Sequence, residues 1–300
     1  MGLDEIMPDK TAVDSIDINE EEAELVLKGI NIPPHPYILL DIAEVYPDIG
    51  KISSIIIKDP SVAGAIIKVI NSAAFSLARE IDSVQEAVTL LGLDSVLNVV
   101  NAVLLKNSFQ DTIDMDALQA FWSASDDTAV AGALIAKELK LCKPDTAYMI
   151  GLFHDCGIPL MMQKQKNYLH LLHKIYGQSQ YAFTTVENHV LKTNHTACGY
   201  FLAKSWKLPK VICEVIKQHH NVELMNELFR GDQSEVATLM AVEKIAEYVT
   251  REYKTIGGSE ESHEWPVIKD SLLAYVGICE LDVEELREKV IETIQEGDAG

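Results

Sequence analysis

The sequence predicts an all-α protein made of many helices, and three observations support this prediction. Apolar residues recur at helical spacing, as Val62, Ile66 and Ile70 do. Helix-start signals also recur, and in Asp59-Pro60 the proline stands near the first helical position. The sequence shows no convincing alternation of apolar and polar residues and no Asn-Gly hairpin turn, so strands are not expected.

Start and stop signals locate the helices along the chain. Asn19 is placed to cap a first helix over 20–28, which Gly29 would end. The proline-rich stretch at 32–36 predicts a rigid connector, and Asp59 starts the next helix. Further helices are predicted from Ser83 to near Leu91-Gly92, from Asp94 onward, over 117–140, from near Pro144 onward, and over 163–176, 195–206, 209–218 and 234–254.

The last part of the chain predicts a loop followed by an amphipathic helix. Residues 257–262 read GGSEES, which is typical of a surface loop. The helix that follows has Asp282 as its cap, Glu285 three residues on, and an apolar stripe of Leu286, Val290 and Ile294. This helix packs either on its own domain, which we favour, or on a partner.

Composition bounds the class of protein. The chain has 300 residues, 48% of them hydrophobic, so it buries a substantial core and is not wholly disordered. Its net charge of −21 disfavours nucleic-acid binding, because acidic surfaces repel phosphate backbones.

No apolar run reaches the length of a membrane span, and no secretory start is evident. Five widely spaced cysteines favour free thiols in a cytoplasmic protein. Trp122 and Trp206 stand among apolar residues and are expected in the core.

Histidines gather in the second half of the chain. His154 and Asp155 are adjacent in GLFHDCG, His195 follows in TNHTACG, and His219 and His220 form a pair. Imidazole and carboxylate ligands together suit Zn, Fe, Mn, Co or Ni. Neighbouring residues of a helix diverge by about 100°, so His154 and Asp155 approach one ion only if their helix faces it squarely. Structural pairing, and contacts with helix C-termini, remain alternative roles for these side chains.

Two stretches of the first half carry a family resemblance: IPPHPYILLDIAEVYPD, and the block from SSIIIKDPSVAGAIIKVINSAAF to EAVTLLGLDSVLNVV. On these motifs, residues 25–250 resemble the HDOD family, the HD-related output domain of bacterial signalling proteins. The resemblance implies an HDOD domain over 20–255, and the acidic, aperiodic sequence of residues 1–19 predicts a mobile segment before it. Within that domain, it implies a helical lobe over about 20–115 packed on an HD-like lobe over about 116–255. Residues 256–300 would then form the C-terminal loop and helix.

The second half is similar to the HD-superfamily phosphohydrolases, whose metal ligands are histidines and aspartates. Glu243 stands where the family has a late aspartate. The resemblance implies a divalent transition metal, with Fe, Mn, Zn, Ni and Co as candidates, and the following ligands: His154, Asp155, His195, His219, His220 and Glu243. No further cofactor is implied.

Three departures from the family pattern weaken the expectation of catalysis. Ala124 replaces an early histidine ligand, and Ile158 replaces a lysine that follows the His-Asp pair in catalytic members. Glu243 is one methylene longer than the aspartate it replaces. Metal-assisted phosphoester hydrolysis needs charges that stabilise the phosphoryl oxygens, and neither an alanine nor an isoleucine supplies one.

The expected function is therefore a non-catalytic or weakly catalytic signalling module, which acts by binding a protein partner or a nucleotide ligand. No catalytic residue is assigned, and neither nucleic acid nor membrane is an expected partner. The alternative is a metal-dependent phosphohydrolase acting on a nucleotide or cyclic dinucleotide. A purely structural scaffold is a third class, which would bind neither ligand nor metal.

Overall fold

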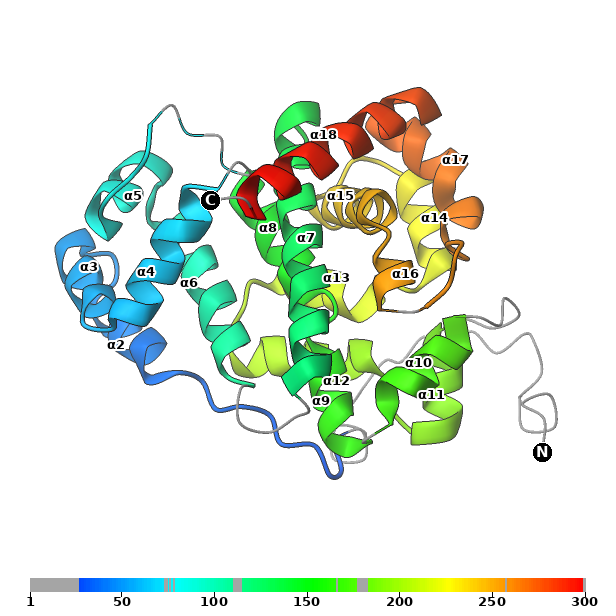
Figure 1. Ribbon diagram of the computed structural model, residues 1–300, viewed down its shortest axis with the longest axis horizontal. Helices are drawn as coiled ribbons and strands as arrows, with labels where there is room; N and C mark the ends of the chain where they lie inside the picture. The colour runs from blue at the N-terminus through cyan, green and yellow to red at the C-terminus, as the bar shows by residue number, and fades with distance from the viewer. Residues whose placement is uncertain are drawn as a thin grey trace.

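The computed structural model describes residues 27–298, apart from 73, 74, 76, 78, 110–114, 166, 177–182 and 257. Within these residues the chain is built of helices and contains no strand (Figure 1), as predicted. The predicted acidic segment 1–19 and most of the predicted helix over 20–28 lie outside the described residues.

The helices form two lobes. An N-terminal lobe, drawn in blue and cyan in Figure 1, packs through α6 against α8 of a larger C-terminal lobe, which α18 covers on one side. The N-terminal lobe contains α2 (Tyr37–Val45), α3 (Ile49–Ile57), α4 (Pro60–Ile70), α5 (Val84–Leu91) and α6 (Leu93–Asn107). The rest of the chain contains α7 (Met115–Leu139), α8 (Pro144–Phe153), α9 (Gly157–Lys164), α10 (Tyr168–Tyr176), α11 (Phe183–Leu191), α12 (His195–Ser205), α13 (Lys210–Gln218), α14 (Val222–Arg230), α15 (Glu235–Thr250), α16 (Glu252–Thr255), α17 (Trp265–Val276) and α18 (Glu280–Asp298).

The caps predicted in the N-terminal lobe are present. The Asp59 carboxylate accepts hydrogen bonds from the backbone N–H groups of Ser61 and Val62 at 3.0 and 3.1 Å, and so starts α4. The Ser83 hydroxyl accepts one from the N–H of Glu86 at 3.2 Å. Gly92, with φ of +88°, ends α5 in a conformation that disfavours side chains, and α6 follows at once. That helix begins one residue before the predicted Asp94.

Asn71 explains a motif of the predicted HDOD block. Its side-chain amide donates to the carbonyl of Ile81 at 2.7 Å, and its side-chain oxygen accepts from the N–H of Ile81 at 2.8 Å. The asparagine thus pairs with the backbone as a strand neighbour would, and it closes the connection between α4 and α5.

Two glycines bring helices of the C-terminal lobe close together. A β-carbon on Gly151 of α8 would lie 2.6 Å from the α-carbon of Ala129 on α7, closer than real contacts allow. A β-carbon on Gly157 would lie 1.8 Å from the carbonyl oxygen of His195. The start of α9 therefore rests directly on the start of α12, which sets the distance between Asp155 and His195.

The connector before α2 ties the N-terminal lobe to the C-terminal end of α12. The indole N–H of Trp206 donates to the carbonyl of Pro33 at 3.0 Å, and Nε2 of His35 lies 3.2 Å from the carbonyl of Trp206. In Figure 1 the connector runs from beside α9 and α12 to α2. Trp206 and Trp122 are both buried, as predicted.

Two long predicted helices are each divided. The predicted helix over 163–176 is wrong, because α9 ends at Lys164, Gln165 adopts an extended conformation and α10 starts at Tyr168. The predicted helix over 234–254 breaks at Arg251, whose left-handed φ of +58° separates α15 from α16.

Several short helices were not predicted, because each is about two turns long or lies between stronger signals. These are α2, α3, α11, α14 and α17. The last helix was predicted, but its cap was not Asp282: α18 already starts at Glu280, and the Asp282 carboxylate accepts from the N–H of Cys279 at 2.7 Å. Leu286 and Val290 are buried, and α18 packs on α15 and α7, which confirms packing on its own domain.

Two further findings concern the class of protein. Among the described residues no helix is both long and apolar enough to span a bilayer. All five cysteines are free thiols: Cys142, Cys156, Cys198, Cys213 and Cys279.

Candidate metal centre

The His-Asp pair lies at the junction of two helices. His154 caps the C-terminus of α8, and its N–H still donates to the carbonyl of Ile150 at 2.8 Å. Asp155 follows in the turn before α9, where its carbonyl accepts from the N–H of Ile158 at 2.9 Å. Because the pair occupies a turn, both side chains face the same interior. His154 is fully buried and Asp155 is 5% exposed.

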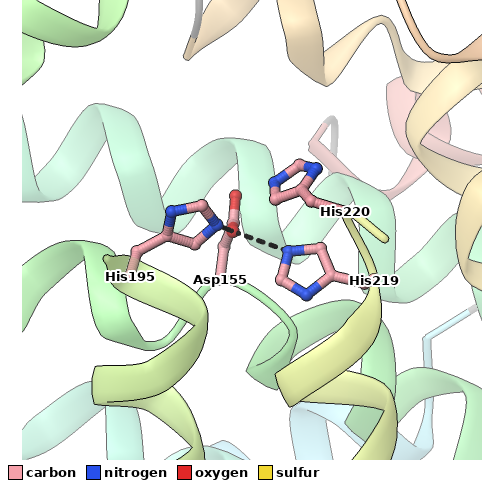
Figure 2. Close-up of side chains that lie close together, drawn as sticks. All are labelled: Asp155, His195, His219 and His220. Atoms are coloured by element: carbon pink, nitrogen blue, oxygen red, sulfur yellow. Dashed lines mark hydrogen bonds and ion pairs between the residues drawn. The ribbon is translucent and has the colours of Figure 1, made fainter. Parts of the chain in front are cut away.

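Four of the predicted ligands meet in what we call the histidine cluster: Asp155, His195, His219 and His220 (Figure 2). Nε2 of His195 lies 3.2 Å from Oδ1 of Asp155, and Nε2 of His219 lies 3.3 Å from the same oxygen. Each of the four residues offers one donor atom within 4.8 Å of the others. His195 comes from the start of α12, while His219 and His220 follow α13.

The Nδ1 atoms of His154 and of the three histidines in the histidine cluster are each held by another group of the protein. Nδ1 of His154 lies 2.9 Å from the carbonyl of Gly151, and that of His219 lies 2.8 Å from the carbonyl of Ile216. Carboxylates hold the other two: Glu187 lies 2.7 Å from Nδ1 of His195, and Glu264 lies 2.6 Å from Nδ1 of His220. Metal-binding histidines are commonly oriented in this way, which leaves Nε2 for the ion.

Glu187 and Glu264 were not predicted from the sequence. Glu187 is fully buried on α11, a helix that the sequence did not predict, and Tyr168 donates a hydrogen bond to its second oxygen. Glu264 precedes α17, which was also missed. A glutamate eight residues before His195 carries no distinctive signal, because only the fold brings α11 against α12.

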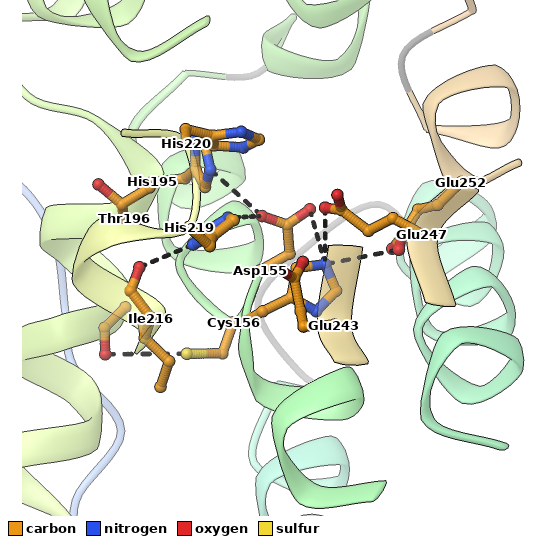
Figure 3. Close-up of polar contacts among 12 residues, drawn as sticks. Asp155, Cys156, His195, Thr196, Ile216, His219, His220, Glu243, Glu247 and Glu252 are labelled. Carbon is orange, nitrogen blue, oxygen red and sulfur yellow. Dashed lines mark hydrogen bonds and ion pairs between the residues drawn. The ribbon is translucent and has the colours of Figure 1, made fainter. Parts of the chain in front are cut away.

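A second group, which we call the acidic cluster, surrounds Nε2 of His154. Its glutamates, Glu243, Glu247 and Glu252, are labelled beside Asp155 in Figure 3. Glu252 lies 3.4 Å from this atom, Glu247 lies 3.6 Å from it, and Asp155 lies 3.6 Å from it through its other oxygen. Glu243 shares a possible ligand set with His154 and Glu247. Asp155 therefore stands between the two clusters.

The six predicted ligands thus come together, in two groups between which Asp155 is shared. Glu243 of α15 approaches His154, and it belongs to no four-residue set with the other three histidines. Glu247 and Glu252 were missed, because a glutamate late in an amphipathic helix normally reads as a solvated residue.

Two of the three departures from the family pattern, Ala124 and Ile158, have clear structural counterparts. Ala124 is buried on α7, and one turn further along Thr128 donates to Glu252 at 2.7 Å. The helix that carries Ala124 thus contacts the acidic cluster through a hydroxyl group. Ile158 is 1% exposed and belongs to the apolar core.

Burial and neighbouring charges together shift the pKa values of the buried histidines, upward for His195 and His154 and downward for His219. Burial disfavours the charged form of His195, yet Glu187 and Asp155 raise its pKa to about 10. Burial likewise opposes a charge on His154, but Glu252 and Asp155 raise its pKa well above the usual value. Burial and the neighbouring His220 lower the pKa of His219 well below its usual range.

The pKa values of the carboxylates Asp155 and Glu243 shift in opposite directions. Burial raises the pKa of Asp155, but His154 and His195 outweigh it, so that its pKa falls well below normal. Burial, followed by the repulsion of Glu247, raises the pKa of Glu243 well above normal. Lys244 is buried beside these groups and pairs with Glu247 at 2.6 Å and with Glu264 at 3.1 Å.

The donor groups fit a divalent metal. Nε2 of His154, His195 and His220 is buried and makes no well-aligned hydrogen bond, although carboxylate oxygens lie 3.2–3.6 Å from the first two. Both carboxylate oxygens of Glu243 are likewise buried without a well-aligned hydrogen bond. Burying polar atoms without hydrogen bonds costs free energy. Several such atoms in one place are therefore typical of a site that binds an ion or a ligand. Three imidazoles and a carboxylate form a donor set suited to Zn, Fe, Mn, Co or Ni. The acidic cluster is richer in oxygen donors.

A comparison with family models identifies the family of the chain. Residues 32–222 match the model of the HDOD domain, so the chain belongs to the HDOD family. This finding bears out the resemblance seen in the sequence.

Similar proteins extend the comparison. A Treponema pallidum (strain Nichols) protein described as uncharacterized is 25% identical over 212 residues, which are 69% of this chain and 41% of that protein. The chain therefore matches less than half the length of that relative.

Two solved structures share the fold. An HDOD domain protein of unknown function from Geobacter sulfurreducens is 24% identical, with a TM-score of 0.63 over 91% of this chain and 97% of its own. A Shewanella amazonensis SB2B protein, whose name proposes a metal-dependent phosphohydrolase, is 18% identical, with a TM-score of 0.63 over 92% and 99%.

Proposed function

We propose that this HDOD protein is a regulatory module that binds a divalent metal and acts by binding a signalling partner rather than by hydrolysis. The observation that supports this proposal is a histidine cluster whose donors are oriented and buried, beside an apolar Ile158. The centre keeps the means to hold an ion and lacks the lysine that stabilises a phosphoryl group in catalytic relatives.

The surroundings of the cluster argue further against catalysis. His154, His195 and His219 are fully buried, and Asp155 is 5% exposed, so a phosphoester has little access to the donors. The nearby ammonium group of Lys244 is already paired with Glu247 and Glu264. Removing one group that stabilises the transition state typically costs about 100–1,000-fold in rate.

Asp155, His195, His219 and His220 would hold the ion, with Mn, Fe, Zn, Co or Ni as candidates. A bound ion would join the α8–α9 turn to α12 and to the end of α13. Its role would be to stabilise this part of the C-terminal lobe and to make its shape depend on metal.

The test combines elemental analysis with thermal melting. The purified protein should contain metal, and dialysis against EDTA should lower its melting temperature, because an ion that binds only the folded state stabilises it. His219→Ala should lose both effects, whereas His189→Ala on α11, which lies outside both clusters, should keep them. A protein free of metal, with a melting temperature that EDTA does not change, would contradict the proposal.

A phosphohydrolase remains the second candidate, and the acidic cluster supports it. Glu247 and Glu252 place carboxylates beside His154, near the helix whose early histidine is replaced by Ala124. The Mn²⁺-loaded protein is therefore assayed with nucleotides and a cyclic dinucleotide. Turnover that disappears in Asp155→Ala and in Glu252→Gln would favour this candidate over the regulatory one.

A further inference from the structure

A cavity lies between the two lobes, away from the metal centre. It has a volume of about 400 Å³ and is lined by residues of α4, α6, α7, α8 and α18. Figure 1 shows the C-terminal end of α18 reaching towards α4. Sites for small molecules in proteins have volumes of about 300–1,000 Å³ and often lie between domains, and this cavity shares both properties.

The walls of the cavity are mainly apolar. Val69 of α4, Val103 of α6, Leu152 of α8 and Ile294 of α18 line it. Tyr148 of α8 also lines it, and its buried ring lies 5.9 Å from that of Phe75. Packed helices normally fill the space between them, so an apolar cavity of this size offers room for the hydrophobic body of a ligand.

Charged groups stand at one side of the cavity. Lys106 of α6 forms an ion pair with Asp126 of α7, and Asp127 lies beside them. Lys68 of α4 also lines the cavity, where its charge attracts the Asp126 carboxylate, but in the described part of the chain it forms no ion pair within 4.0 Å. Lys68 therefore has an ammonium group available to an anion, and Lys106 lies on the same wall.

We propose that this inter-lobe cavity binds an amphiphilic anion, with an apolar body among α6, α7, α8 and α18 and an acidic group on Lys68. A carboxylate, sulfonate or phosphate supplies the required charge. Because the ligand touches both lobes and α18, its binding would hold these parts together. The proposal does not depend on the metal centre, since none of the residues that line the cavity belongs to either cluster.

The experiment uses two dyes that share an aromatic skeleton and differ in charge. 1-Anilinonaphthalene-8-sulfonate carries a sulfonate, and N-phenyl-1-naphthylamine carries none. Both are titrated into the full chain, and their fluorescence gives a dissociation constant and a stoichiometry. We expect one saturable site for the sulfonate dye, with weaker binding of the neutral dye.

Three variants locate the site. Lys68→Met should weaken binding of the sulfonate dye by about tenfold, because one charge-assisted contact is lost. It should change binding of the neutral dye by less than about twofold. Ala65→Trp on α4 and Ile294→Trp on α18 fill the cavity from opposite sides and should prevent binding of both dyes. Circular dichroism and the melting temperature show whether each variant is folded.

The control is Lys51→Met in the groove between α2 and α3, which Lys51 lines. This change should leave both dyes unaffected. The proposal is overturned if no saturable site is found up to about 1 mM dye, which is a free energy of only about −4 kcal/mol. It is also overturned if folded tryptophan variants still bind the sulfonate dye, if Lys68→Met leaves its affinity unchanged, or if Lys51→Met weakens it.

Discussion

In the candidate metal centre, a histidine of the cluster can be oriented by a second side chain that contacts its Nδ1 atom. Glu187 illustrates this: one carboxylate oxygen accepts from Tyr168, and the other lies 2.7 Å from Nδ1 of His195. The same oxygen accepts from the backbone N–H of His195 at 3.3 Å. Glu187 therefore fixes both the ring and the start of α12.

Glu187→Gln should weaken metal binding by about 10–100-fold, the usual effect of losing a partner that orients a ligand. The amide retains the shape of the carboxylate but loses the charge that favours the correct histidine orientation. Titration calorimetry with Mn²⁺ measures the affinity. Glu227→Gln on the exposed side of α14 is the matched control, and equal affinities in the two variants would contradict the role of Glu187.

Trp206 gives a second prediction, which concerns stability. Trp206→Ala should lower the free energy of unfolding by about 3–5 kcal/mol, because it removes a large buried ring. Trp206→Phe retains an aromatic ring and loses the hydrogen bond to Pro33, so it should cost less, with about 1 kcal/mol coming from that bond. Urea denaturation compares the two, and an unchanged midpoint for the alanine variant would refute the core role.

Helices are positioned by close contacts at their ends as much as by their apolar faces. α9 and α12 meet where Gly157 touches the carbonyl of His195, and Gly199 approaches the same place: a β-carbon there would lie 3.2 Å from the N atom of Gly157. Both glycines lie where α9 meets α12, close to Asp155 and His195. Because they have no side chain, the two helices can approach closely enough to bring these ligands together.

Gly157→Ala should separate α9 from α12 and displace His195 from Asp155. We expect a lower melting temperature and at least tenfold weaker Mn²⁺ binding. Gly64→Ala is the control, because no atom lies within 4 Å of its added methyl group and alanine favours a helix. That variant should be neutral or more stable by up to about 1 kcal/mol. Normal Mn²⁺ affinity in Gly157→Ala would show that the contact is not needed.

The C-terminal helix presents two neighbouring positions with opposite surroundings. Val290 is 1% exposed, whereas Ile291 is 44% exposed. Val290→Asp buries a carboxylate and should detach α18 from α15 and α7, while Ile291→Asp should have little effect. Limited proteolysis near residue 278 detects the detachment, and equal resistance of both variants would argue against it.

The molecule as a whole is joined by contacts between residues distant in the sequence. Trp206 binds the connector before α2, and α6 packs on α8. The two lobes should therefore unfold together, in one transition seen equally by tryptophan fluorescence and by circular dichroism. Two separated transitions would show that the lobes are independently stable.

The sequence alone determined the helical character of the chain, and it predicted candidate ligands that the structure brings together. Local signals suffice for these: Asp59 and Ser83 cap their helices through bonds that span two or three residues. The His-Asp pair and the three later histidines were also visible, because imidazole beside carboxylate is unusual in an apolar segment.

Only the tertiary structure decided how closely those residues approach one another and what supports them. Asp155 stands between two clusters, Glu243 joins the acidic one, and Glu187 and Glu264 hold the histidines from helices or loops that had no clear signal. The physical reason is that such contacts join side chains 8 to 98 residues apart, as Glu187 with His195 and His154 with Glu252. Periodicity and capping act over a few residues, whereas these distances depend on how the helices pack.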